Sequence, residues 1–124
     1  MTTPTTQVGT RLLFENERVR VWDLSLAPGE FLESHVHRDD FLFVVAQGGH
    51  LRHADPDNPE DSREVRYEDG LVVFREVDGE VLHHRLTNLG DAPYRNFVVE
   101  LKEPAPLAEE PTPLVPRDPP ETGR

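Results

Sequence analysis

Pairs of turn-forming residues divide most of this chain into short segments, and their spacing constrains the fold more than any other feature. They are Pro-Gly at 28–29, Gly-Gly at 48–49, and Asp-Gly at 69–70 and 78–79. Glycine accepts the positive φ angles that tight turns need, and Gly-Gly and Asp-Gly pairs are typical of β-hairpins. The intervening segments are rich in β-branched and aromatic residues and lack a helical period. We therefore expect about eight or nine short strands in an all-β sandwich or barrel, with the short apolar strands favouring a closed barrel.

Prolines are concentrated at the end of the chain, where seven of the 12 lie between Pro104 and Pro120. Proline fixes φ and lacks the backbone N–H, so this stretch is neither a central strand nor a helix. We divide the chain into a flexible N-terminal segment (1–9), one β-barrel domain (10–102) and a proline-rich, extended C-terminal tail (103–124). An apolar barrel face on so short a folded region favours a homodimer, built by sheet-to-sheet contact or by exchanged N-terminal strands.

The charge and cysteine content exclude several classes of protein. Lys and Arg total 13 against 24 Asp and Glu, which gives a net charge of −11, and there is no cysteine. The negative charge argues against nucleic acids and anionic membrane surfaces as partners. The absence of cysteine excludes disulfides and thiol chemistry. Because the sequence also lacks an apolar run that could span a bilayer and a secretory signal, we expect a soluble, cytoplasmic protein without membrane contact.

Side-chain alternation predicts which face of the last strand is buried. Phe97, Val99 and Leu101 share one face, and the opposite face carries polar residues such as Asn96 and Glu100. The more apolar face is normally the buried one. We therefore assign the face with Phe97 to the core.

The same argument separates two adjacent histidines. His84 shares a strand face with Leu82 and Leu86, whereas His83 falls on the opposite, polar side. The alternation predicts that His84 points into the barrel and His83 points to solvent. Near the middle of the chain, His53 is also assigned to solvent, next to a polar loop.

Three of the histidines could bind one metal ion. His35 and His37 lie two residues apart, so their imidazoles share one face of a strand and can approach an ion from one side. His84, from a neighbouring strand, would complete a facial set and leave coordination positions open for water or substrate. A His-x-His pair alone is a weak motif, and a surface pair or a hydrogen-bonded core histidine is the ordinary alternative.

The spacing of these residues resembles that of the cupin superfamily. The matching positions are Gly29, His35, His37 and Gly48 in the first cupin motif, and Gly70, His84 and Asn88 in the second. The resemblance covers residues 11–101 and implies a single-domain jelly-roll β-barrel with an internal metal site. Residues 37–41 further resemble a run in small single-domain cupins associated with β-alanine degradation.

One departure from the cupin motifs bears on the chemistry. The first motif usually has a Glu four residues after its second histidine, and Phe41 stands there instead. The implied site has three neutral histidines, so the ion keeps its full charge and is a stronger Lewis acid. The resemblance suggests Fe(II), and Mn(II), Ni(II), Zn(II) and Cu(II) stay open because ligand type does not separate them.

We expect a substrate pocket around the ion, formed by aromatic residues and two charged ones. Its predicted members are Trp22, Glu33, Phe41, Phe43, Arg95 and Phe97. An aromatic setting favours a small, partly apolar substrate that chelates the metal. Arg95 at the pocket entrance would favour an anionic substrate.

These features predict a metal-dependent enzyme acting on a small molecule, of the Fe(II) dioxygenase type. A redox-neutral lyase or isomerase could use the same ion purely as a Lewis acid. Two non-enzymatic alternatives stay open, namely a cupin that holds a small ligand without converting it, and a structural cupin whose site has decayed. No catalytic residue beyond the metal ligands is assigned, since the fold hosts many unrelated reactions.

Overall fold

The computed structural model describes residues 4–102, and these residues form eleven β-strands and no helix. The strands are β1 (Arg11–Glu15), β2 (Val19–Leu26), β3 (Phe31–Leu32), β4 (His35–His37), β5 (Asp40–Gln47), β6 (Gly49–Asp55), β7 (Asn58–Tyr67), β8 (Val72–Arg75), β9 (Val81–His83), β10 (Arg85–Asn88) and β11 (Tyr94–Leu101). The predicted all-β class is confirmed. The predicted proline-rich tail lies outside the described residues. Within residues 4–102, no helix is long and apolar enough to cross a membrane.

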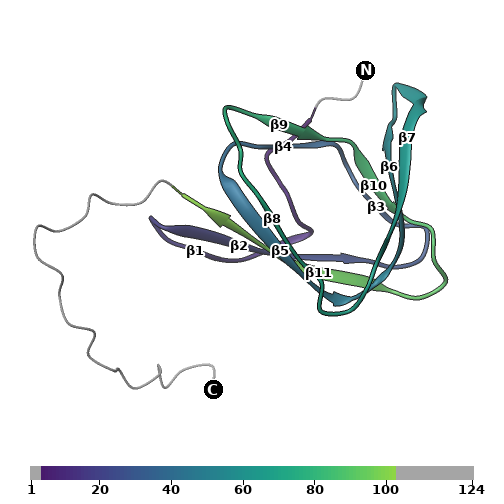
Figure 1. Cartoon of the computed structure of the whole chain (residues 1–124), viewed down its shortest axis with the longest axis horizontal. Helices are drawn as coiled ribbons and strands as arrows, with labels where there is room; N and C mark the ends of the chain where they lie inside the picture. Colours follow the sequence, from purple (N-terminus) through teal and green to yellow (C-terminus); the bar gives the residue numbers. More distant parts are fainter. Residues whose placement is uncertain (1–3, 103–124) are drawn as a thin grey trace, which may run out of the picture.

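Three antiparallel sheets wrap around a common interior (Figure 1). The largest has five strands in the order β1-β2-β11-β5-β8, and the second has four in the order β3-β10-β6-β7. The short pair β4-β9 lies along one side of the barrel in Figure 1. This jelly-roll arrangement brings strands that are far apart in the sequence to one interior, which is where the site lies.

The turn-forming pairs mark the strand ends as expected, but they do not all make hairpins. Gly29, Gly70 and Gly79 adopt positive φ angles of 82°, 83° and 83°, as tight turns require. At Gly48 the chain instead crosses from the five-stranded to the four-stranded sheet, because β5 and β6 are not paired. A Cβ at Gly48 would lie 2.1 Å from the carbonyl oxygen of Tyr67, so close backbone approach explains this glycine.

The buried face of β11 is the opposite of the predicted one. Its interior positions are buried along the whole strand, whereas Phe97 and the other members of its face are only half-buried. Two contacts offset the burial of these polar side chains: Asn96 Nδ2 donates to Tyr94 Oη at 2.7 Å, and Glu100 accepts from Trp22 Nε1 at 2.8 Å. Asn96 Oδ1 is buried without a hydrogen-bond partner among the described residues. The prediction that the more apolar face of β11 is the buried one is therefore wrong.

Residues at the start of the described chain belong to the barrel. Thr5 forms a parallel bridge with His35, where Val36 N donates to Thr5 O at 2.7 Å and Thr5 N donates to Ser34 O at 3.1 Å. Val8 is 1% exposed and lies in the hydrophobic core. The prediction of a flexible segment over 1–9 is therefore wrong for residues 4–9, because Val8 fills part of the interior and the backbone around Thr5 extends the pairing of β4.

Candidate metal centre

Three imidazoles meet inside the barrel, and they come from the paired strands β4 and β9. His35 stands directly opposite His83 in this pair, and His37 shares the face of His35 two residues on. One ring nitrogen of each residue lies within 4.8 Å of those of the other two. The ring centroids are 4.7 to 5.2 Å apart. Imidazole nitrogens bind transition metals at about 2.0–2.1 Å, so one ion placed between these three could contact all of them after small side-chain rotations.

Burial keeps these imidazoles in the neutral form that binds metals. It lowers the pKa of His37 and of His83 to about 3, with like charges on neighbouring residues adding to the effect, and it also lowers the pKa of His35. A neutral imidazole has a free lone pair on one nitrogen. The three rings therefore need not lose a proton to coordinate an ion at neutral pH.

Hydrogen bonding also fits a metal at this place. His35 Nδ1 lies 3.1 Å from the carbonyl oxygen of Glu33, which can only accept, so Nδ1 carries the proton and Nε2 is free to coordinate. His37 Nδ1 is buried and has no hydrogen-bond partner among the described residues. Buried polar atoms without partners are rare, and an ion held by the cluster would account for this one.

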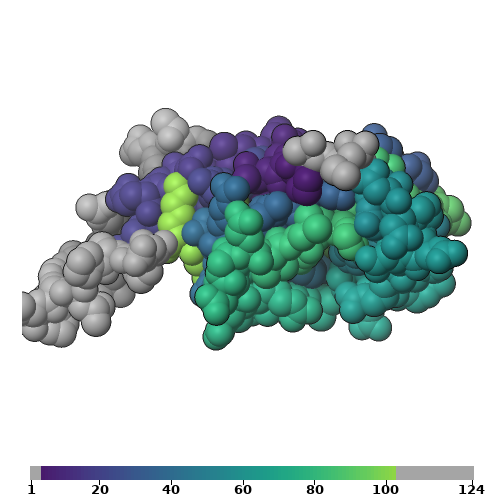
Figure 2. Space-filling model, turned by 90° about the horizontal axis from the view of Figure 1, so that it is seen from above, coloured from purple at the N-terminus to yellow at the C-terminus, as the bar shows by residue number. Residues whose placement is uncertain are grey.

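The cluster lines a cavity of about 360 Å³. Its wall is mainly aromatic and aliphatic, with a few polar groups. The members outside the histidine cluster include Leu24, Phe41, Phe43, His53, Tyr67, Tyr94, Asn96 and Val98. Figure 2 shows two surfaces that border it side by side, the green one around β9 and the teal one of β6 and β7. An apolar cavity with a few convergent polar groups is typical of a small-molecule site.

The fold matches those of several solved structures. A cupin domain from Bordetella pertussis Tohama I is 26% identical with a TM-score of 0.63, and the match covers 83% of this chain and 99% of that one. An uncharacterized conserved protein with a double-stranded β-helix domain from Klebsiella pneumoniae is 19% identical with a TM-score of 0.57, over 80% and 81% of the two chains. A cupin superfamily protein from Desulfitobacterium hafniense DCB-2 is 17% identical with a TM-score of 0.54, over 83% and 84%. The described part of this chain therefore has the fold of small cupin domains. No protein-family model and no curated protein matches the sequence.

The third histidine of the cluster is His83, whereas the sequence predicted His84. The strand breaks at His84, between β9 and β10, and the inward alternation shifts by one residue there. Leu86 is 5% exposed and faces the core, but Leu82 is 50% exposed, so the two leucines do not share a face. Extending the alternation back from Leu86 therefore selected the wrong histidine.

His84 instead contacts acidic residues at the edge of the cavity. Its Nε2 lies 3.2 Å from Asp61 Oδ2, and Asp55 lies in the same small group. The sequence offers two adjacent histidines as the third metal ligand. It does not distinguish them, because no local signal marks the break between β9 and β10.

Phe41 occupies the cluster in place of the carboxylate of the cupin motif. Its ring stacks on His37 with centroids 3.8 Å apart and an angle of 13° between the planes. Asp40 points away and accepts from Val77 N at 2.7 Å. Within residues 4–102 no carboxylate joins the three histidines, as expected for a site made of imidazoles alone.

His53 is a cavity residue that sequence reasoning assigned to solvent. Its ring centroid lies 6.2 Å from that of His83, and its Nε2 is buried without a hydrogen-bond partner in the described part of the chain. Burial lowers its pKa to about 4, and the positive charge of Arg63 adds to this. The alternation of β6, in which Leu51 is fully buried, was the signal that could have placed His53 inside.

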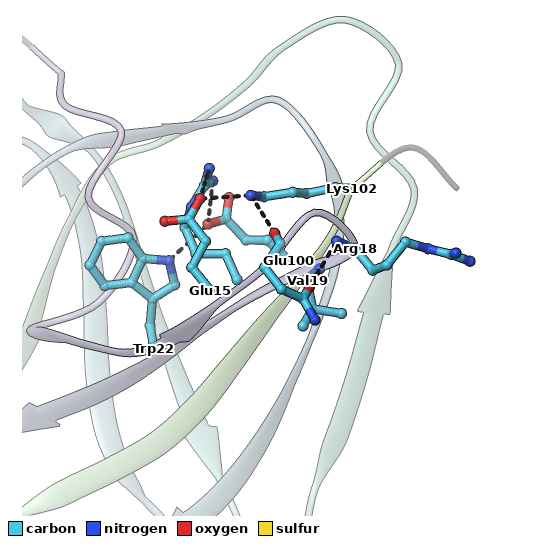
Figure 3. Close-up of polar contacts among 8 residues, drawn as sticks. Glu15, Arg18, Val19, Trp22, Glu100 and Lys102 are labelled. Carbon is cyan, nitrogen blue, oxygen red and sulfur yellow. Dashed lines mark hydrogen bonds and ion pairs between the residues drawn. The ribbon is translucent and has the colours of Figure 1, made fainter. Parts of the chain in front are cut away.

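Of the six predicted pocket residues, Phe41 and Phe43 line the cavity and four do not. Trp22 lies at another end of the barrel, where its Nε1 donates to Glu100 (Figure 3). Lys102 Nζ donates to Glu15 in the same network, and Arg20 links both carboxylates. Trp22 therefore has a structural role in closing this end of the barrel.

The other three residues make their contacts outside the cavity. Glu33 accepts from Arg85 at 2.7 Å, and only its backbone carbonyl reaches the histidine cluster. Arg95 donates to Asp23 at 2.8 Å, and its guanidinium lies 4.8 Å from the centroid of the Phe97 ring. Arg95 and Phe97 lie on the outer face of β11. The sequence placed them in the pocket because it assigned the wrong face of this strand to the core.

Proposed function

We propose that this cupin is a metal-dependent enzyme of the Fe(II) dioxygenase type, acting on a small organic substrate that chelates the metal. The observation that carries the proposal is the group of His35, His37 and His83 beside a mainly apolar cavity, with no carboxylate among them. The first two are buried and the third is half-buried, and their lowered pKa values leave all three neutral at pH 7. Three protein ligands leave positions open for a bidentate substrate and dioxygen.

Each residue of the cluster has a definable role in such an enzyme. The three imidazoles hold the ion, and the Glu33 carbonyl fixes the tautomer of His35. Phe41 keeps the ring of His37 in place by stacking and excludes water from one side of the site. The bound metal would supply Lewis acidity and, if it is Fe(II), reducing equivalents for dioxygen.

Metal content of the purified protein tests the ligand assignment. Wild-type protein, loaded with Fe(II), Mn(II), Ni(II) or Zn(II) and then desalted, should retain one of them stoichiometrically. His83→Ala should lose it, and the matched control His84→Ala should keep it. A wild type without metal, or loss in His84→Ala with retention in His83→Ala, would contradict the assignment.

Oxygen uptake then tests the reaction. The Fe(II)-loaded protein should consume oxygen with a member of a panel of β-dicarbonyls and small hydroxy acids, and His83→Ala should not. Conversion of a substrate without oxygen uptake would replace the oxygenase with a redox-neutral enzyme. Binding of a panel member without conversion would favour the non-catalytic ligand carrier.

A further inference from the structure

Two arginines face the cavity beside the histidine cluster. Arg63 on β7 stands directly opposite His53 on β6, and Arg75 on β8 stands directly opposite Phe41 on β5. Directly opposite residues of an antiparallel pair point to the same face of the sheet. Both residues therefore belong to the inner face, and both line the cavity at positions that are exposed to solvent.

Neither arginine has an anionic partner in the described part of the chain. Elsewhere in the barrel, Arg85 and Arg95 pair with carboxylates at 2.7 Å and 2.8 Å. No such contact involves Arg63 or Arg75 within residues 4–102, although the chain carries 24 acidic residues against 13 Lys and Arg. Each of these two arginines is therefore available for an anion from outside.

The charges that face the cavity leave it positive. Asp61 is the one carboxylate among the described lining residues, and its Oδ2 lies 3.2 Å from His84. Two guanidinium groups and a divalent ion in the cluster would outweigh this single negative charge. The two arginines lie where the cavity is open to solvent, so their charges attract an anion as it enters.

We propose that Arg63 and Arg75 form a carboxylate-binding subsite, so that the substrate is a small organic acid with a chelating end toward the histidine cluster and a second carboxylate toward the arginines. Only the chelating end of this substrate depends on the proposed function; the second carboxylate does not. Arginine suits this role because its planar fork donates two parallel hydrogen bonds to one carboxylate.

Tyr67 supports the placement of the two guanidinium groups. Its ring lines the same cavity, and burial raises the pKa of its hydroxyl while the charges of Arg63 and Arg75 act to lower it. Both positive charges thus act on one half-buried hydroxyl that lines the same cavity. The subsite lies where β7 and β8 approach the cavity, with Tyr67 available as a further hydrogen-bond donor to the carboxylate.

Malate and lactate distinguish the subsite from the metal site. Both have the same chelating hydroxy-carboxylate, but only malate has a second carboxylate. In calorimetric titrations, metal-loaded wild type should bind malate about tenfold or more tightly than lactate, as expected for one added charge-assisted contact. Arg63→Gln and Arg75→Gln should each remove most of this difference and leave lactate binding unchanged.

Arg66→Gln is the matched control. Arg66 lies on the same strand as Arg63, is exposed, faces outward and has no ion pair in the described residues. Its replacement should leave both affinities unchanged. Equal affinity of wild type for malate and lactate, or the same loss in Arg66→Gln, would overturn the subsite.

Metal content of each preparation separates the two proposals. If the protein holds metal but does not prefer malate, the subsite is wrong and the metal centre stands. If the protein holds no metal, succinate titrated against the metal-free protein tests the arginines alone. Succinate binding that both glutamine variants lose would support the subsite, and no binding by wild type would refute it.

Discussion

On strand β11, polar side chains lie on the buried face and apolar side chains on the half-exposed face. On β11 the inner positions include Asn96 and Glu100, which are polar and buried, whereas the outer positions include Phe97 and Val99, which are apolar and half-exposed. The inner face can hold polar groups because their partners are also inside. The outer face has apolar groups without a cover in the single chain. The difference shows that this barrel uses its interior for a site and leaves apolar surface on its outside.

The outer face forms a continuous apolar row across all five strands. The register places its members side by side, one on each strand: Phe14, Val21, Val99, Leu42 and Phe74. Phe14 and Phe74, at the two edges, are 53% and 50% exposed. Four inter-strand spacings of about 4.8 Å separate Phe14 from Phe74, so the row is roughly 19 Å long, which fits within an interface of about 800 Å² per partner. We expect a second copy of the chain to cover this face in a homodimer.

The largest expected difference in unfolding free energy is between alanine variants of an inner and an outer phenylalanine. Phe41 is 1% exposed and stacks on His37, so Phe41→Ala should lower the unfolding free energy by about 3–5 kcal/mol. Phe74→Ala, studied at concentrations where the protein is monomeric, should change it by about 0.5 kcal/mol or less. Urea unfolding of both variants measures the difference. Equal effects would show that the two faces do not differ in burial.

Glu100 tests whether the polar inner face depends on its internal partners. Glu100→Ala leaves Trp22 Nε1 and one contact of Arg20 without an acceptor, and we expect a loss of about 2–3 kcal/mol. Glu100→Gln keeps a carbonyl oxygen that can accept from Trp22 and should recover part of the loss. Thermal unfolding of the two variants gives the comparison. An alanine variant as stable as wild type would mean that these hydrogen bonds do not support the buried carboxylate.

A substitution at Val44 tests whether a second copy of the chain covers the outer face. Val44 lies on β5 next to the apolar row and is 37% exposed. Val44→Lys should convert the dimer to a monomer in light-scattering measurements, with little change in the stability of the monomer. Glu60→Lys, an exposed change on β7, is the matched control and should leave the dimer intact. A wild type that is already monomeric would contradict the homodimer.

The sequence predicted features that depend on neighbouring residues. The glycine turns marked the strand ends, and the spacing of His35 and His37 placed both rings on one face. It did not identify His83, because the break at His84 arises where β9 and β10 pair with strands of different sheets.

Features that depend on long-range pairing were missed or inverted. Arg63 and Arg75 reach the cavity through their register with His53 and Phe41, which alternation along a single strand does not supply. The core face of β11 was inverted because alternation identifies two faces without saying which is inside. The usual choice of the apolar face fails where the interior contains a polar site.

The smallest effect concerns the ion pair of Arg95 and Asp23 on the outer face. The hydrogen bond from Arg95 lowers the pKa of Asp23 below its ordinary value of 3.8, with a further contribution from Ser25. Because the folded-state pKa is lowered, the stabilisation is present above pH 3.8 and is lost as the pH falls through the folded-state pKa. Arg95→Ala should therefore reduce stability slightly at pH 7, since the Arg95 side chain is 41% exposed and solvent screens its charge, and should have no effect once Asp23 is protonated. Urea unfolding of wild type and variant over this pH range measures the difference, and a gap that widens as the pH falls would contradict the assignment.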